Sequence, residues 1–382
     1  MSSCSCSSCS PPPPPPPKRP RRGSNTDFAT TRGGRKKHLY LALDDWSGGY
    51  SIHRLDADDM EPSGRLPRPA AQRIASPPRA PGYPAWPMAF AAVGTSIFID
   101  PNPRVRMNHD HRLGPPVFVF DTDTGALSLG PNVPDRLYDL DSAMAVGDKL
   151  YAVTVSPTME VLSWVPKLPP LDLWQPTMEW SWKSLPLPTP APLHGRDIEA
   201  YAVHPDGRTI FMSTTGSTHS YDTIDGVWRE LGNWVLPFRG QAYFDDDLDA
   251  WVGLHDRKEG FLCCCRVASR GGAAATTRPP ECKILGERMF CFRGEEVEEE
   301  DPIRRRLRIT LTYMGDGGFC LVENVMHPDE RDRIDRVSVL YVTLFGLQYD
   351  RNGDLQVKAR RTTRSYRVPK NTVSFSHAAF WM

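Results

Sequence analysis

The sequence predicts an all-β protein, a β-propeller of about six blades and possibly seven, preceded by a disordered tail. Three observations predict this class. Short runs rich in β-forming residues alternate with turns that contain Gly, Asp or Pro. No segment keeps a helical period over about twelve residues. Two local sequence patterns also recur along the chain, as repeated structural units require.

Composition limits the function classes. The 382 residues carry 46 Lys and Arg against 46 Asp and Glu, and 40% of them are hydrophobic. A chain without net charge lacks the excess of cations that a general nucleic-acid coat needs. No run approaches the roughly 18 apolar residues of a membrane span, so no membrane association is expected.

Residues 1–37 are expected to form a disordered tail, because a Ser/Cys-rich start and seven consecutive prolines cannot bury enough apolar surface to offset the cost of ordering. The tail carries two basic clusters, Lys18–Arg22 and Arg32–Lys37. They indicate a nuclear-import signal or a tether to an anionic partner, or simply a solubilising segment.

The cysteines of the tail predict no site. Cys4, Cys6 and Cys9 lack the fourth ligand that closes a tetrahedral zinc site, and palmitoylation is the other alternative to a tail without a role. No apolar segment follows a basic start, as a secretory signal would require. We therefore expect an intracellular protein, in the cytoplasm, the nucleus or both, whose nine cysteines mostly remain thiols.

The body, 38–382, is read as the propeller. Its expected strands include 39–43, 96–99, 117–120, 150–155, 209–212, 308–313 and 339–345. Dipeptides such as Asp206-Gly207 and Asn352-Gly353 separate such runs, and they suit tight hairpins because Gly and Asn tolerate positive φ.

The first recurring pattern is a turn glycine, two further residues and an apolar-aromatic strand. Residues 92–99 align without gaps on residues 145–152, and 207–212 form a looser third copy. The copies start roughly 50 to 60 residues apart, which is about the length of one propeller blade. Dividing the body by this period predicts six or seven blades.

The second pattern is an aromatic strand end, a polar Asp/Thr/Gly turn and a return strand. Residues 120–127 match 221–228, and 348–355 form a late, degenerate copy. Trp182–Pro186 parallels Trp228–Gly232 in the same way. We also expect the final run, 373–382, to pair in the same blade as 39–43 and so close the ring.

The aromatic-Asp-x-x-x-Gly-x-Trp turn, with Gly-x-x-Leu-Tyr before it, resembles a kelch blade. Across 38–382 the chain also resembles a group of kelch-like plant proteins, expanded in grasses and known only as a domain of unknown function. The resembling segments are 39–45, 120–127 and 376–382. The resemblance implies a kelch-like propeller and brings no established activity.

Three insertions are expected to interrupt the blades. Residues 60–87 are rich in Pro, Arg and Ala, 268–283 are rich in Gly, Ala and Thr, and 294–303 contain an acidic run. Long connections are tolerated at strand ends because the entropy of loop closure grows slowly with loop length.

The segments that first suggest metal binding fail on spacing. In Asp121–Gly125 the glycine is fifth and the twelfth residue is Asn132, whereas a calcium loop needs Gly sixth and Glu twelfth. We read it as a turn whose Asp and Thr side chains bond nearby backbone N–H groups. His109 and His111 have no identifiable third ligand, so a surface loop is favoured there.

Two further clusters allow both a structural and a functional interpretation. Cys263–Cys265 is expected in a strand, with Cys264 on one face and its neighbours on the other, packing as small hydrophobes rather than as redox or ligand groups. Asp245–Asp247 is expected as a hairpin turn, with a metal site or a site for a basic partner as the alternative.

Catalysis has no specific sequence support. His194, His204, His219 and His255 are scattered, and the nucleophile-elbow, phosphate-loop, dinucleotide and zinc-protease motifs are absent. No catalytic, cofactor-binding or metal-binding residue is therefore assigned, no cofactor is expected, and the protein is not expected to be an enzyme.

Four tryptophans lie close together in the sequence and bear on protein binding. Trp164, Trp174, Trp180 and Trp182 gather in the Pro-rich stretch 160–192. Burial between blades is the favoured interpretation, and an exposed patch there would suit a protein-binding surface.

The function predicted is a non-catalytic module that presents propeller loops to a protein partner of unknown identity. The alternative is an enzyme or small-molecule binder that uses the central channel. Convergent His or carboxylate groups at one mouth would favour this alternative. A third hypothesis is nucleic-acid binding through the basic tail and residues 351–370. The favoured interpretation of 358–367 is instead an outer blade edge, whose charges discourage pairing with another sheet.

Overall fold

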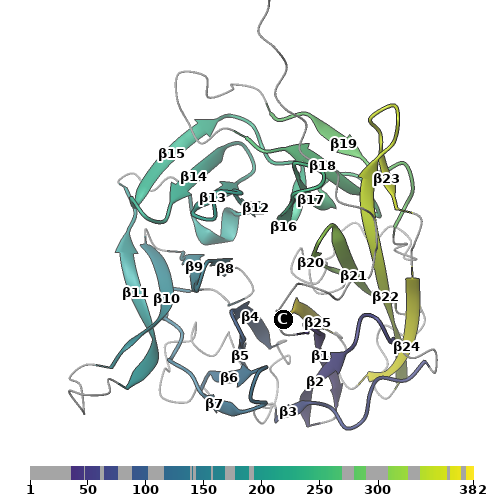
Figure 1. The fold of residues 1–382 in the computed structure, drawn as a ribbon. Helices are drawn as coiled ribbons and strands as arrows, with labels where there is room; N and C mark the ends of the chain where they lie inside the picture. The colour runs from purple at the N-terminus through teal and green to yellow at the C-terminus, as the bar shows by residue number, and fades with distance from the viewer. Residues whose placement is uncertain are drawn as a thin grey trace, which may run out of the picture.

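The computed structural model is an all-β ring of radially arranged sheets (Figure 1), so the predicted β-propeller is confirmed. It describes residues 36–382 except 47, 61–63, 76–87, 102–115, 138–139, 141–142, 156–157, 168–176, 189–192, 269–278, 290–308, 326–335, 359–361 and 371–375. Within these residues there are 25 strands, and the helical structure is limited to the 3-10 turn η2 (Gly195–Asp197). No helix of this part is long and apolar enough to cross a membrane.

The strands form five sheets, which we divide into six blades and name from the ring centre outward. Blade 1 has β25 (His377–Trp381), β1 (Leu39–Trp46), β2 (Gly49–Leu55) and β3 (Gln72–Ala75). Blade 2 has β4 (Ala89–Val93), β5 (Ser96–Asp100), β6 (Phe118–Asp121) and β7 (Leu127–Leu129). Blade 3 has β8 (Met144–Val146), β9 (Lys149–Val153), β10 (Thr158–Pro166) and β11 (Met178–Pro186).

Blades 4 and 5 share the one eight-stranded sheet of the described chain. Blade 4 has β12 (Ala200–Val203), β13 (Thr209–Ser213), β14 (Thr218–Asp222) and β15 (Val227–Gly232). Blade 5 has β16 (Phe238–Asp245), β17 (Ala250–His255), β18 (Leu262–Arg266) and β19 (Cys282–Ile284). The two blades join through parallel pairing of β12 with β16 at the ring centre.

Blade 6 has β20 (Ile309–Gly315), β21 (Gly318–Val325) and the long β22 (Arg336–Tyr349). Two strands share its outermost position. β23 (Leu355–Val357) pairs with the end of β22, and β24 (Thr362–Lys370) pairs with its first part. The described strands therefore form six blades, within the range that the period of the sequence repeats predicts.

The ring is closed by the last strand of the chain, as predicted. β25 pairs antiparallel with β1 from Leu39↔Trp381 to Leu43↔His377. Backbone bonds between His38 and Met382 extend this pairing by one residue pair. The Thr312 hydroxyl of blade 6 donates to the Ala379 carbonyl, so β25 also contacts the blade before it.

The hydrophobic core is divided among the interfaces between blades. The described residues form six buried clusters, one between each pair of neighbouring blades, including one between blade 6 and blade 1. Both faces of a blade are therefore apolar, because each face packs on a neighbour. This is why the strands read as nearly continuous apolar runs rather than as clean alternations.

Both recurring sequence patterns have a structural counterpart. Gly94, Gly147 and Gly207 each occupy the turn between the first two strands of a blade, with φ of 60 to 70°. The second pattern forms the turn between the third and fourth strands in blades 2, 4 and 6. There Asp121, Asp222 and Asp350 accept backbone N–H groups of their own turns. The turn interpretation of Asp121–Gly125 is thus confirmed.

The expected insertions are only partly described. The expectation of one irregular loop over 60–87 is wrong at 72–75, which form β3, a four-residue strand too short to show a period. Met60 and Leu66 from the same segment are buried between blades 6 and 1. The expected insertion over 268–283 is also wrong at 282–283, which begin β19. Residues 294–303 lie outside the described residues, as do 269–278 and residues 1–35 of the predicted tail.

The closing strand gives the fold a dependence on pH. His377 is buried, and its Nε2 lies 3.2 Å from the Val322 carbonyl. Burial lowers the pKa of His377 from 6.5 to about 4. The unfolded chain therefore takes up the proton first, and the stabilising contribution is present above about pH 6.5 and is lost as pH falls toward about 4.

We predict that His377→Gln, which keeps a donor for the Val322 carbonyl, flattens the loss of stability between pH 6.5 and 4. The full effect of the shift is on the order of 3 kcal/mol. Chemical denaturation at several pH values measures it, with the exposed His194→Gln as the control. Equal pH slopes for wild type and His377→Gln would contradict the assignment.

Candidate functional site

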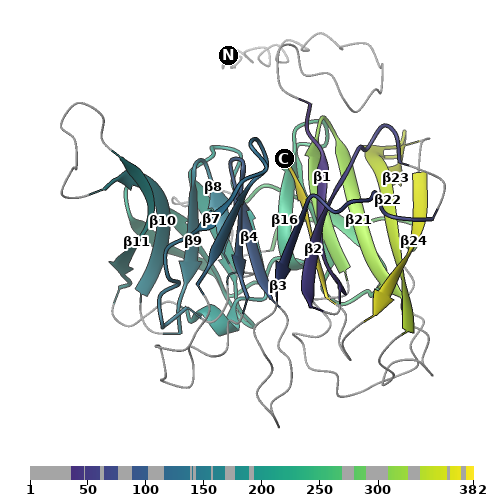
Figure 2. The same cartoon turned by 90° about the horizontal axis from the view of Figure 1, so that it is seen from below.

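One end of the ring is built from short turns. Because neighbouring strands in a blade are antiparallel, the turn from first to second strand and the turn from third to fourth strand lie at the same end. We call it the turn end, and the C-terminus lies there (Figure 2). Loops at one end of a propeller are positioned rigidly by the strands beneath them, which makes them suitable for binding.

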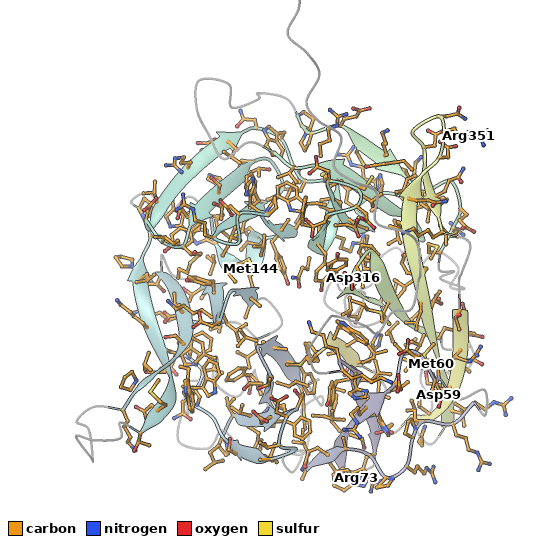
Figure 3. The ribbon with its side chains drawn as sticks, in the orientation of Figure 1. Asp59, Met60, Arg73, Met144, Asp316 and Arg351 are labelled. Carbon is orange, nitrogen blue, oxygen red and sulfur yellow. The ribbon has the colours of Figure 1, made fainter. Side chains whose placement is uncertain are left out.

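The turn end carries an acidic turn cluster between blades 5 and 6. It comprises Asp245, Asp246, Asp247 and Asp249 of the β16–β17 turn and Asp316 of the β20–β21 turn. Asp316 lies close to the centre of the ring, as does Met144 of blade 3 (Figure 3). The predicted hairpin at Asp245–Asp247 is confirmed, since Asp245 pairs with Ala250 across it.

The backbone of this cluster is strained. Asp249 and Asp316 both have φ of 49°, and they are the two non-glycine residues with positive φ in the described chain. Asp tolerates this conformation better than most residues, at some cost in free energy. Strained residues of this kind gather at functional sites, so their adjacency on two neighbouring turns points to binding.

Two side chains of the cluster and the side chain of Lys358 converge around Gly317. A Cβ at Gly317 would lie 3.2 Å from Asp247 Oδ2, 3.7 Å from Asp245 Oδ2 and 4.0 Å from Lys358 Nζ. Lys358 forms a long ion pair with Asp247, with Nζ and Oδ2 3.8 Å apart. A side chain at position 317 would also adopt an unfavourable φ of 72°, so only glycine suits this position.

Asp245 is the buried member of the cluster. Its residue is 1% exposed, and its Oδ1 accepts the Leu248 N–H at 2.9 Å. Its Oδ2 is buried and has no hydrogen-bond partner among the described residues. Burial raises the pKa of Asp245, and the charge of Asp247 raises it further. A cationic group placed at this oxygen would lower that pKa and relieve the cost of the buried charge.

The neighbouring Tyr313 reports the electrostatic field of the cluster. Burial is the main reason that the pKa of its hydroxyl rises to about 12, and the carboxylates of Asp245, Asp246 and Asp316 add to the shift. These groups from two blades therefore act on one point. The cluster has five carboxylates near one lysine. Its chemistry therefore suits the binding of a cationic group.

A metal ion is not indicated. No group of three or more His, Cys, Asp or Glu residues among the described positions has a geometry that could hold one. His109 and His111 lie outside the described residues.

The strands that line the ring centre in blades 4 and 5 present uncharged polar groups. The hydroxyls of Tyr201 on β12 and Tyr243 on β16 both donate to Gln241 Oε1, at 3.4 and 3.1 Å. Burial raises the pKa of Tyr243, so its hydroxyl stays neutral at physiological pH. This network has no group that could act as a general base near pH 7.

The predicted faces of Cys263–Cys265 are confirmed. Cys264 packs between blades 5 and 6, whereas Cys263 and Cys265 pack between blades 4 and 5. Burial raises the pKa of Cys264 and Cys265, so both remain thiols, as expected for small apolar groups in a core.

The scattered histidines serve separate local structures. His204 stacks on Phe211, and its Nδ1 accepts the Asp206 N–H. His255 lies at the end of β17 beside Asp256. His219 is buried on β14, where burial lowers its pKa, and His194 is exposed beside η2. None of these arrangements places a histidine on a nucleophile.

The tryptophan stretch divides between core and surface. Trp180 and Trp182 pack against the cluster between blades 2 and 3, in agreement with the favoured prediction of burial. Trp164 is 48% exposed and lies opposite Trp180 across the β10–β11 pair, with ring centroids 5.3 Å apart. Trp174 lies outside the described residues.

Sequence patterns did not predict Asp316, Gly317 or Lys358 as site residues. The run Gly315-Asp-Gly-Gly318 carries a signal, because an aspartate between glycines predicts a tight turn with positive φ. Lys358 carries none. Lys358 follows β23, and its side chain reaches the cluster by passing over Gly346 of β22.

Known proteins match the chain at the level of family and general shape. A family model described as a protein of unknown function (DUF1668) matches residues 36–366. No curated protein matches.

Among solved structures, the β-propeller domain of Cps50 (Swd1) from Myceliophteria thermophila is 11% identical. The match covers 60% of this chain and 64% of that one, with a TM-score of 0.34. The WD40 domain of SCAP from fission yeast is 9% identical over 75% and 66% of the two chains, with a TM-score of 0.24.

A third solved structure is PorZ, a surface component of the type-IX secretion system of Porphyromonas gingivalis. It is 10% identical over 87% of this chain and 32% of that one, with a TM-score of 0.31. The chain thus spans less than two thirds of the length of each of these three structures. The division into six blades follows from the strand pairing of this chain alone.

The raised pKa of Asp245 predicts an unusual stability effect. A folded pKa above the ordinary 3.8 makes the stabilising contribution of Asp245 fully present below about pH 4 and lost as pH rises through the folded value. Asp245→Asn keeps an acceptor for the Leu248 N–H and removes the buried charge. We predict a higher Tm for Asp245→Asn at pH 8, by about 2 to 4 °C for each kcal/mol relieved.

Thermal melts at pH 8 and pH 4 measure this effect, with the exposed Asp246→Asn as a matched control. The gain of Asp245→Asn should shrink at pH 4. A variant that is less stable than wild type at pH 8 would show that the charge of Asp245 is needed for folding rather than reserved for a ligand.

Proposed function

The chain belongs to the DUF1668 family of proteins of unknown function, and we propose that it acts as a non-catalytic protein-interaction module. In this proposal the acidic turn cluster receives a basic segment of a protein partner at the turn end of the propeller. The rigid blades hold the turns in place, so little conformational entropy is lost when the partner binds.

The observation that carries the proposal is the unpartnered Oδ2 of Asp245. A buried carboxylate oxygen without a donor costs free energy unless a ligand supplies one. The strained turns that surround it and the excess of carboxylates over Lys358 support the same reading. An Arg or Lys side chain of a partner would supply both the charge and the hydrogen-bond donors.

Finer features of the proposal come from the sequence. The recurring Asp-x-x-x-Gly turns support a kelch-like blade, and the resemblance to kelch-like plant proteins supports a plant origin. The free cysteines among the described residues support an intracellular location. The basic clusters of 18–22 and 32–37 would then direct import into the nucleus or keep the protein soluble.

A second candidate function is small-molecule binding at the centre of the ring. Two observations favour it: the carboxylates that converge around Gly317 at the turn end, and the network of Tyr201, Gln241 and Tyr243 on the innermost strands of blades 4 and 5. Such neutral donors and acceptors suit a neutral polar ligand. A thermal-shift screen with neutral metabolites distinguishes this function, because it requires no basic partner.

Binding of a labelled oligo-arginine peptide, measured by fluorescence anisotropy, tests the main proposal. We expect wild type to bind this peptide with an affinity that falls as salt is added. We expect no binding to an oligo-glutamate peptide. The triple variant Asp246→Asn, Asp247→Asn, Asp316→Asn should bind at least tenfold more weakly, equivalent to about 1.4 kcal/mol.

The control is the triple variant Asp148→Asn, Asp197→Asn, Asp225→Asn, which changes three exposed aspartates of blades 3 and 4 and of the 3-10 turn between them, outside the acidic turn cluster. Both variants change the net charge equally, so a general charge effect would weaken binding equally in both. Equal weakening, or no binding by wild type, would overturn the proposed site.

A further inference from the structure

The outermost strands of the six blades differ in how much open edge they present. Four of these strands are only three to six residues long: β3, β7, β15 and β19. Blade 6 ends in β23 and β24, of which β24 has nine residues. Blade 3 ends in β11, which also has nine residues. Only β11 and β24 are therefore long enough to pair extensively with another chain.

The long edge of β24 is covered by this chain itself. The Arg367 N–H donates to the Gly64 carbonyl at 3.1 Å, and Arg364 Nε donates to the Met60 carbonyl. By contrast, no described segment bonds to the outer edge of β11, which lies at the rim of the ring (Figure 1). Native proteins usually shorten, cover or block such edges, and β11 has a proline only at its end.

The pairing with β10 shows which backbone groups face outward. The Lys167 N–H donates to the Thr177 carbonyl, so this opposed pair is a hydrogen-bonded one. Hydrogen-bonded and non-bonded pairs alternate along an antiparallel ladder. The odd-numbered residues of β11 therefore bond to β10, while the backbone groups of Met178, Trp180, Trp182 and Ser184 point away from the blade.

We propose that the outer edge of β11 pairs with the β11 edge of a second copy of this chain, forming an antiparallel two-fold dimer centred on Ser181. Two four-stranded blades would then become one continuous sheet across the dimer. This surface lies at the outer rim of blade 3, away from the acidic turn cluster, so the proposal is independent of the proposed function.

Charge complementarity selects the register. With Ser181 opposite its own copy, Glu179 lies opposite Lys183 of the second copy, and the pair occurs twice by symmetry. Neither side chain has an ion pair with another described residue, so each is available. Centring the pairing on Trp180 or Trp182 also matches outward backbone groups, but it places Glu179 opposite Ser181 or Leu185.

The same register gives the tryptophans a role. Trp180 lies opposite Trp182 of the second copy, and within each chain Trp164 lies opposite Trp180 and Leu162 opposite Trp182. Each four-strand row across the dimer therefore reads Trp164, Trp180, Trp182 and Leu162. Aromatic pairs across strands stabilise sheets, and this row would extend over the exposed Trp164.

Sedimentation-velocity ultracentrifugation of the full chain tests the dimer. We expect a dimer at micromolar concentration, and at least tenfold weaker dimerisation for Glu179→Lys and for Lys183→Glu, because each variant opposes like charges twice. An equimolar mixture of the two variants should form a heterodimer, since both opposed pairs are then complementary. The double variant should also form a dimer by itself.

The matched control is the pair Arg229→Glu and Glu230→Lys on β15, the exposed outer strand of blade 4, which should leave dimerisation unchanged. Circular dichroism shows that each variant is folded. A monomeric wild type, large heterogeneous aggregates, or a mixture of single variants that stays monomeric would each overturn the proposal.

Discussion

The pairing of β25 with β1 is the constraint on which the rest of the structure depends. It joins the last described residues of the chain to the first strand, so the blade that opens the ring also closes it. Each blade buries both of its faces against its neighbours, and no cluster of the core belongs to one blade alone. Without the closing strand, the cluster between blades 6 and 1 would lose one of its contributors and β1 would present an unpaired edge. Stability is therefore shared around the ring rather than held in one centre.

Closure also determines where binding can occur. The faces of the blades are used for packing, so three kinds of surface remain: the turns, the centre of the ring and the outer edges. The acidic turn cluster belongs to the first kind and combines a buried, unpartnered carboxylate oxygen with two strained aspartates. The β11 edge belongs to the third kind. A protein that binds a partner at the turns and a second copy at the rim would present two partner sites in one assembly, which raises avidity without new contacts.

Much of the fold could be predicted because blades repeat in sequence. The glycine turns at Gly94 and Gly147 and the Asp turns at Asp121 and Asp222 indicated the strand-turn-strand units and their period. The pairing of the final run with 39–43 followed from the need to leave no open edge. The candidate site could not be predicted in the same way, because Asp245, Gly317 and Lys358 meet only after two blades have packed. The strand β3 was missed because four residues carry too little pattern to distinguish a strand from a loop.

The most direct test of the closed ring is hydrogen exchange on a chain that ends at Ser376 and so lacks β25. If closure holds the ring together, amide protection should fall in all six blades, since opening one interface removes support from each neighbour in turn. The full-length chain should show slow exchange in β1 and in the middle strands of every blade. If instead protection is lost only in β1 and the rest of the ring exchanges as before, the blades are stable independently and closure is not the central constraint.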